Sequence, residues 1–270
     1  MKKVALITGA SAGIGKETVK LLLNDGFTVY AAARRLEKMD DIKQLGGNIL
    51  KMDVSDDASM VQGVNSIISV EGHIDVLVNN AGYGSYGSLE DTPMSEARYQ
   101  FEVNVFGLAR LCQLIIPYMR KQGWGKILNV SSIGGKVGMP YGSWYHASKF
   151  AVEGLSDCLR MELKQFGIDV ILIEPGVIKT EWNAIARDNL LKVSGQTAYK
   201  GLVVRHAHTM EVGNSDGSDP IVIANLINKA IHARHPEARY AAGKSAALVL
   251  LLRKILPDKM GDTVMLSQLK

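Results

Sequence analysis

The stretch Thr8-Gly9-Ala10-Ser11-Ala12-Gly13-Ile14-Gly15 separates two different hydrophobic patterns. Before it, residues 4–7 form a short apolar run, typical of a strand that is buried on both faces of a parallel sheet. After it, apolar side chains recur at helical spacing as far as Gly26, which we expect to cap the helix. Strand, glycine-rich turn and helix, in this order, are the context in which a turn binds a dinucleotide.

The glycines of this turn have separate physical uses. Gly9 permits a tight exit from the strand, while Gly13 and Gly15 lack the Cβ atoms that would keep a pyrophosphate away from the backbone N–H groups at the helix start. The spacing is G-x-x-x-G-x-G and not the G-x-G-x-x-G fingerprint. Taken alone, the turn therefore leaves a ligand site and a plain loop as alternatives.

The second predicted strand, residues 27–33, ends in two arginines. Sites that prefer NAD carry a carboxylate near this place, which binds the ribose 2′-hydroxyl. Here Arg34 and Arg35 stand there instead, and guanidinium groups can bind a 2′-phosphate. The sequence therefore predicts NADP(H) in preference to NAD(H), with Arg34 as the main contact; the alternative is that both arginines are solvated loop charges.

Strand and helix patterns alternate along most of the chain. Further strands are expected at residues 48–52, 74–78, 126–130, 168–173 and 238–241. This alternation predicts an α/β fold of the Rossmann-type, doubly wound, with three α/β/α layers around a mainly parallel sheet of about seven strands, in one domain over residues 1–270. Four glycines interrupt residues 177–219, where we expect a loosely ordered substrate lid.

Polar residues follow several of these strands. Asp53 comes after the third, and Asn79-Asn80-Ala81-Gly82 ends the fourth. Ligands of open parallel sheets lie at this edge, although Asn side chains can also simply hold a loop. Asn104 lies in the middle of a predicted helix over residues 98–119, where a buried amide needs a hydrogen-bond partner.

Tyr145 and Lys149 are four residues apart in a predicted helix that extends to about residue 166. At this spacing both side chains leave the same helix face. A nearby ammonium is expected to lower the pKa of the phenol, which can then exchange a proton near neutral pH. An ordinary amphipathic helix with a surface lysine is the alternative.

With the glycine turn, these motifs resemble the short-chain dehydrogenase/reductase family of the single-domain type, with its steroid and retinol dehydrogenase-like members as the nearest in appearance. The resemblance covers about the first 180 residues and rests on the glycine turn, Asp53, Asn79-Asn80-Ala81-Gly82, Asn104, Ser132, Tyr145-x-x-x-Lys149 and Pro175-Gly176. Ser132 lies 13 residues before Tyr145, which matches the family pattern and selects it over Ser131.

The resemblance implies an NAD(P)-dependent oxidoreductase with four catalytic residues. Tyr145 would be the general acid/base, Lys149 would lower its pKa and hold the nicotinamide ribose, and Ser132 would bind the substrate oxygen together with Tyr145. Asn104 would hold a water linking Lys149 to solvent. Cofactor contacts are implied for Gly9, Ser11, Gly13, Ile14, Gly15, Arg34, Asp53, Val54, Asn79, Ala81, Gly82, Tyr145, Lys149, Pro175, Gly176, Val177 and Thr180. A homodimer or homotetramer follows by the same analogy.

The substrate is expected to be an apolar carbonyl compound. Val137, Met139, Tyr141 and Trp182 suggest an apolar pocket for a steroid- or lipid-like ketone or aldehyde, or they form ordinary core. A non-catalytic NADP-binding sensor or scaffold, or a 3-oxoacyl thioester reductase, are the alternative functions.

Three histidines are singled out. His146 replaces the small residue that many relatives carry. We expect it at the surface or the edge of the core, and an extra polar group near the pocket is the alternative. His206 and His208 lie in the lid and could touch a substrate.

Composition limits the other possibilities. The net charge of +4, without a basic run, argues against nucleic acid. No carboxylate partner at metal-ligand spacing is visible for His206 and His208, so we expect no metal site. Two cysteines in apolar patterns favour a reducing, cytoplasmic location. Residues 246–252 are apolar but reach less than half the length that spans a bilayer. We expect no integral membrane segment and a buried or interface helix there, while peripheral contact through Arg253 and Lys254 stays open.

Overall fold

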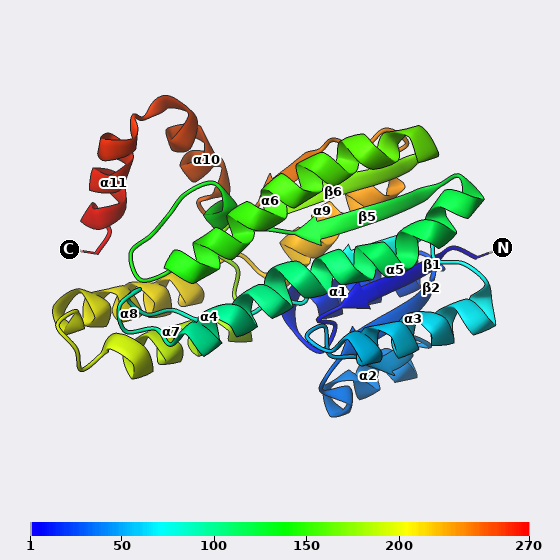
Figure 1. Ribbon diagram of the computed structural model, residues 1–270, viewed down its shortest axis with the longest axis horizontal. Helices are drawn as coiled ribbons and strands as arrows, with labels where there is room; N and C mark the ends of the chain where they lie inside the picture. Colours follow the sequence, from blue (N-terminus) through cyan, green and yellow to red (C-terminus); the bar gives the residue numbers. More distant parts are fainter. Residues whose placement is uncertain (1, 270) are drawn as a thin grey trace.

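A computed structural model describes residues 2–269 of the chain, which build a seven-stranded parallel sheet flanked by helices (Figure 1). The strand order is β3-β2-β1-β4-β5-β6-β7, and every neighbouring pair is parallel. Their bounds are β1 Val4–Thr8, β2 Thr28–Ala33, β3 Asn48–Lys51, β4 Val76–Asn79, β5 Gly125–Val130, β6 Ile168–Pro175 and β7 Arg239–Ala242. The direction of winding reverses between β1 and β4, so the predicted doubly wound fold is confirmed.

Helices cover both faces of the sheet because successive strand residues point to opposite sides. Leu6 and the other strand residues that point to the same face pack under α3 (Asp57–Glu71), α5 (Gly107–Gln122) and α6 (Ser143–Leu163). Ile7 and the strand residues that point to the opposite face pack under α1 (Gly13–Asn24), α2 (Asp40–Gln44) and α9 (Pro220–His232). These two apolar clusters are the cores of the three-layer structure (Figure 1). Short 3₁₀ turns, η1 Leu36–Met39, η3 Ile133–Gly135 and η4 Lys164–Phe166, connect several of the elements.

The predicted helix around Asn104 is interrupted. An α-helix, α4 (Met94–Phe101), continues into a π-helical turn, η2 (Glu102–Phe106), and then into α5. Asn104 lies in the middle of η2. π-turns inside helices are uncommon and occur mostly at functional sites.

The expectation of a loosely ordered segment at residues 177–219 is wrong. It folds into two helices, α7 (Glu181–Ser194) and α8 (Lys200–Ser215). Ala186 and Leu190 of α7 pack against Val203 of α8 in a third buried apolar cluster. This packing outweighs the low helix propensity of glycine, so that Gly201 and Gly213 fall inside α8.

The last two helices, α10 (Ala246–Ile255) and α11 (Asp258–Ser267), lie beyond the same end of the sheet as α7 and α8 (Figure 1). Leu248, Leu251 and Ile255 of α10 are each more than half exposed. The helix is therefore not fully buried within the described chain, and the alternative of an interface helix stays a prediction. Over residues 2–269, no helix has the length and apolar character needed to cross a bilayer.

Candidate active site

A cavity of about 780 Å³ opens at the carboxyl ends of the strands. It begins at the glycine turn, where Ser11 and Arg34 line it, and it passes Tyr145. It then continues between α8 and the C-terminal helices, where Val249 and Met265 line it. The cavity therefore joins the predicted dinucleotide site to a second, mainly apolar compartment.

The glycine turn leaves the start of α1 open toward this cavity. Gly9 and Gly13 have φ angles of +66° and +56°, which other residues rarely adopt. Ala12 precedes α1 and gives it no side-chain cap, and the first turn of α1 contains no acidic residue. Unpaired N–H groups at a helix start attract anions, so the residues present fit the pyrophosphate of a dinucleotide.

Asn80 holds the glycine turn in place. Its side-chain amide donates to the carbonyls of Thr8 and Gly9 at 3.0 and 3.3 Å. A Cβ atom on Gly15 would lie only 2.5 Å from the Asn80 amide nitrogen, so Gly15 serves close packing and does not line the cavity. Asn79 points into the core, where it donates to Asn129 Oδ1 at 2.9 Å. Neither Gly15 nor Asn79 lines the cavity, so their contact with the cofactor stays a prediction.

Basic side chains gather just after β2, at the glycine-turn end of the cavity. Arg34 lines the cavity as predicted, and it donates to the Tyr99 hydroxyl at 2.9 Å. Arg35 pairs with the Glu181 carboxylate at 2.9 Å and donates to Ser11 Oγ at 3.3 Å. Lys38 reaches the other oxygen of Glu181 at 2.8 Å. Sequence reasoning missed Glu181, which comes from a helix far along the chain.

The other predicted cofactor residues line the cavity, namely Gly9, Ser11, Gly13, Ile14, Asp53, Val54, Ala81, Gly82, Tyr145, Lys149, Pro175, Gly176, Val177 and Thr180. Asp53 Oδ1 accepts hydrogen bonds from the backbone and hydroxyl of Ser55 at 3.0 and 2.7 Å.

Ser132, Tyr145 and Lys149 meet on the cavity wall. Ser132 follows β5, and its Oγ accepts from the N–H of Gly134 at 3.0 Å. Tyr145 lies in the first turn of α6 and is 8% exposed. The Lys149 ammonium donates to the Val130 carbonyl at 2.9 Å and lies 6.0 Å from the centre of the Tyr145 ring.

The predicted lowering of the Tyr145 pKa by Lys149 stays a prediction, because burial dominates the pKa of the phenol in this structure. Burial raises the pKa of Tyr145 to about 12, and a hydrogen bond from Ser132 offsets only part of that effect. Burial also lowers the pKa of Lys149 to about 8, against the attraction of Glu153. Desolvation decides both values because both groups are almost inaccessible to water, and the phenol is therefore protonated at neutral pH.

Asn104 does not line the cavity, and its side chain is engaged by other groups. Its Oδ1 accepts from the N–H of Tyr83 at 2.7 Å, while its Nδ2 donates to the Tyr83 carbonyl at 2.8 Å and to Ser148 Oγ at 3.0 Å. Asn104 thus joins η2 to α6 and fixes the backbone of Tyr83, which does line the cavity. Its implied water contact stays a prediction.

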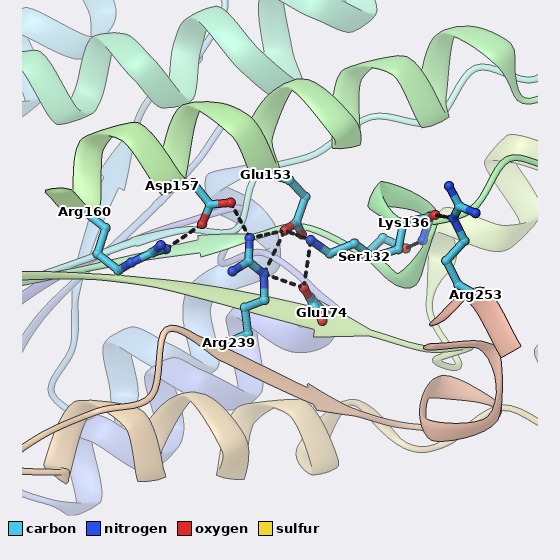
Figure 2. A network of polar contacts seen from close by, with 9 residues as sticks. Ser132, Lys136, Glu153, Asp157, Arg160, Glu174, Arg239 and Arg253 are labelled. Atoms are coloured by element: carbon cyan, nitrogen blue, oxygen red, sulfur yellow. Dashed lines mark hydrogen bonds and ion pairs between the residues drawn. The ribbon is translucent and has the colours of Figure 1, made fainter. Parts of the chain in front are cut away.

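Two buried carboxylates, Glu153 and Glu174, belong to one network of ion pairs (Figure 2). Glu153, one turn after Lys149 along α6, pairs with Lys136 at 2.6 Å and with Arg239 at 3.2 Å. Arg239 also reaches Glu174, which precedes Pro175, at 3.2 Å. The network connects α6, β6 and β7, and it fixes the helix that carries Tyr145 and Lys149.

Aromatic rings surround Tyr145 on the cavity wall. Tyr86 and Trp182 lie 5.6 and 4.9 Å from Tyr145, ring centre to ring centre. Val137, Met139 and Trp182 line the cavity as predicted, and Tyr141 belongs to the buried cluster beside it. Sequence reasoning missed Tyr86, which lies in a loop without a recognisable motif.

The histidines differ from expectation in part. His146 is 7% exposed and lines the cavity, so it is the polar group near the pocket that was the alternative, and not a surface residue. His206 also lines the cavity, whereas His208 is exposed outside it.

Comparisons with known proteins agree with this geometry. Residues 3–190 match the family model described as short chain dehydrogenase. A 3-ketodihydrosphingosine reductase of Bacteroides thetaiotaomicron is 37% identical, over 96% of this chain and 94% of that protein. An NADPH-dependent 3-dehydrocapnine reductase of Ornithobacterium rhinotracheale is 32% identical, over 99% and 98%.

A solved structure extends this agreement to three dimensions. A short-chain dehydrogenase from Streptomyces avermitilis superposes with a TM-score of 0.77 at 30% identity, and the match covers 93% of this chain and 92% of that one. The chain therefore belongs to the short-chain dehydrogenase family and is an NAD(P)-dependent oxidoreductase.

Proposed function

We propose that the protein is an NADP(H)-dependent reductase that interconverts a ketone and its secondary alcohol on a long, apolar, lipid-like substrate. The observation that carries this proposal is the position of the Tyr145 hydroxyl group. Tyr145 and Ser132 lie on the wall of a single cavity that joins the open start of α1 to an apolar compartment. A carbonyl in that compartment can meet both hydroxyl groups and a bound nicotinamide.

Bound NADPH would supply the hydride, with its electron pair, to the carbonyl carbon. Tyr145 gives its phenolic proton to the carbonyl oxygen, for which its raised pKa keeps it in the required protonated form. Ser132 donates a hydrogen bond to the same oxygen while negative charge develops there. Lys149 holds its positive charge beside the phenol and stabilises the phenolate that remains after proton transfer.

The shape of the cavity supports a long substrate. Beyond Tyr145 it continues past Met210 to Val249 of α10 and Met265 of α11. The two relatives described above are named as reductases of 3-ketodihydrosphingosine and 3-dehydrocapnine, which are long-chain ketones. We therefore extend the notion of a lipid-like substrate to long-chain ketones, ahead of steroids and 3-oxoacyl thioesters.

The test is the loss of NADPH absorbance at 340 nm with three carbonyl compounds, namely 3-ketodihydrosphingosine, a steroid ketone and a 3-oxoacyl thioester. We expect the long-chain ketone to give the highest kcat/KM. The Tyr145→Phe variant should lose turnover by at least a hundredfold and keep NADPH binding, measured by fluorescence. Binding of NADPH without reduction of any of the three compounds would favour a non-catalytic sensor instead.

The cofactor preference needs its own measurement. Arg34 and Arg35 offer two guanidinium groups at the 2′-position, and no carboxylate follows β2 directly. We expect a lower KM for NADPH than for NADH, and Arg34→Asp should reverse the order because a carboxylate repels the 2′-phosphate. A wild-type preference for NADH would contradict the proposal. A cytoplasmic location and assembly as a homodimer or homotetramer stay predictions.

A further inference from the structure

Two buried imidazoles face the substrate end of the cavity. His146 of α6 and His206 of α8 are 7% and 3% exposed, and both line the cavity. Their rings lie against Tyr86, at 6.4 and 6.0 Å between ring centres. The ring of His146 also lies 5.5 Å from that of Tyr145. Two helices far apart in sequence thus bring polar rings to one place beside the reacting hydroxyl group.

The protonation of His146 can be deduced from its partner. Its Nδ1 lies 2.9 Å from the Gly134 carbonyl, which can only accept a hydrogen bond, so Nδ1 carries the hydrogen. Burial lowers the pKa of His146, so the ring is neutral at pH 7. Its Nε2 therefore presents a lone pair. Within residues 2–269 this buried atom receives no hydrogen bond.

His206 is in a similar state. Burial, with a smaller contribution from His146, lowers the pKa of His206 to about 4, so this ring is neutral as well. Its Nδ1 is buried and has no partner anywhere in the described part of the chain. Unpaired buried polar atoms are costly and uncommon in native proteins. Both residues line the same cavity and lie against the same ring, Tyr86, which indicates that a ligand supplies the missing partner.

The chemistry of these rings limits what the partner can be. The Nδ1 of His146 carries the hydrogen, so this ring offers only an acceptor at Nε2 and its partner must bring an N–H or O–H donor. The neutral His206 ring can present its free Nδ1 as an acceptor to the same donor. The acidic residues that line the cavity, Asp53 and Glu181, belong to the cofactor end and leave this part without a carboxylate. An ordinary fatty or steroid ketone has no donor next to its carbonyl group. A 2-amino ketone does, and its amino group donates whether or not it is protonated.

We propose that His206 and His146 form a polar subsite beside Tyr145 that accepts a hydrogen bond from the amino group of a long-chain 2-amino ketone. The inference rests on the proposed function, because it places the carbonyl of that substrate at Tyr145 and Ser132. The amino group, one carbon away, then lies against the imidazoles. The alkyl chain extends past Met210 toward Met265. The two histidines are substrate-positioning groups and take no part in hydride or proton transfer.

The test compares two substrates that differ only in the amino group: 3-ketodihydrosphingosine and the same chain with hydrogen at carbon 2. Wild type should prefer the amino ketone at least tenfold in kcat/KM. His206→Leu should lower that preference at least tenfold, because the leucine removes one of the two acceptors of the amino group. His208→Leu, an exposed position on the same helix, is the matched control and should leave the preference unchanged. His206→Asn, which keeps a polar atom near the place of Nδ1, should restore part of it.

A binding measurement separates this inference from the proposed function. The product, dihydrosphingosine, should quench the fluorescence of Trp182, which lines the cavity, and His206→Leu should raise its Kd at least tenfold while NADPH still binds. Equal preference in wild type and His206→Leu, with equal Kd values, would overturn the subsite and leave the reductase proposal intact. If wild type reduced neither ketone, the reductase proposal would fail, and the Kd comparison would still decide the subsite.

Discussion

Glu181, the first residue of α7, holds Arg35, which follows β2, in an ion pair of 2.9 Å. The pair connects the α7–α8 helices to the basic groups that we assign to the 2′-phosphate. Arg35 and Lys38 lower the pKa of Glu181 by hydrogen bonding, so its carboxylate is charged at neutral pH. A 2′-phosphate must therefore compete with Glu181 for the same guanidinium.

Glu181→Gln should consequently tighten NADPH binding. The side chains of Arg35 and Glu181 are 43% and 46% exposed, and exposed pairs are worth at most about 1 kcal/mol. We expect the Kd of NADPH to fall about twofold to fivefold, and that of NADH to stay the same, in a fluorescence titration. Glu211→Gln is the control, since Glu211 pairs with Arg187 on the same helix pair. An equal gain for both cofactors would mean that Glu181 acts on helix position and not on the phosphate.

Lys149 should make stability depend on pH. Its pKa is lowered from 10.5 to about 8 by burial, so between these values the unfolded chain binds more protons than the folded one. The contribution of Lys149 to the free energy of unfolding therefore rises as the pH increases from 8 to 10.5, by roughly 3 kcal/mol for a pKa shift of this size. Urea denaturation of wild type and Lys149→Met over this range measures it. The difference between the two proteins should move in favour of wild type as the pH rises, and a constant difference would contradict the lowered pKa.

Arg239 should be important for stability although it lies outside the cavity. It is shared by Glu153 and Glu174, whose side chains are only 6% and 4% exposed (Figure 2). Removing one partner of a buried pair leaves an uncompensated charge, so Arg239→Met should lower the free energy of unfolding by about 3–5 kcal/mol. Arg160→Met removes a surface partner of Asp157 and should cost less than about 1 kcal/mol. Thermal unfolding of the two variants gives the comparison, and similar Tm values would show that Lys136 alone neutralises the buried carboxylates.

Much of the fold could be predicted because its signals are local. The apolar run before Gly9 and the helical spacing after it define β1 and α1 within a few residues of their observed bounds. The prediction for residues 177–219 was wrong because four glycines suggested that no regular helix forms there. Only the packing of Leu190 against Val203, a contact between segments, explains why helices form there.

The residues of the candidate site were predictable where one local motif places several of them together. The i, i+4 spacing correctly puts Tyr145 and Lys149 on one face, and both line the cavity. Their pKa values were not predictable, because both depend on burial, which for Tyr145 includes the rings of Tyr86 and Trp182 from other elements. Glu181 and His206 were missed or left open for the same reason: nothing in their local sequence shows what they face across the fold.

Gly15 offers a direct test of how the glycine turn is built. A Cβ atom there would lie 2.5 Å from both Asn80 Nδ2 and the Gly9 carbonyl oxygen, closer than real Cβ contacts. Because one of these atoms belongs to the backbone, Gly15→Ala must shift the turn itself. We expect a loss of about 1–3 kcal/mol in the free energy of unfolding and weaker NADPH binding, since the N–H groups at the start of α1 move.

Gly154→Ala is the matched control for this substitution. Gly154 lies within α6, and a Cβ atom there would meet nothing within 4 Å, so alanine should stabilise the helix by roughly 0.5–1 kcal/mol. Urea denaturation and NADPH titration of both variants check the two outcomes together. If Gly15→Ala bound NADPH as tightly as wild type, the start of α1 would not be where the pyrophosphate lies.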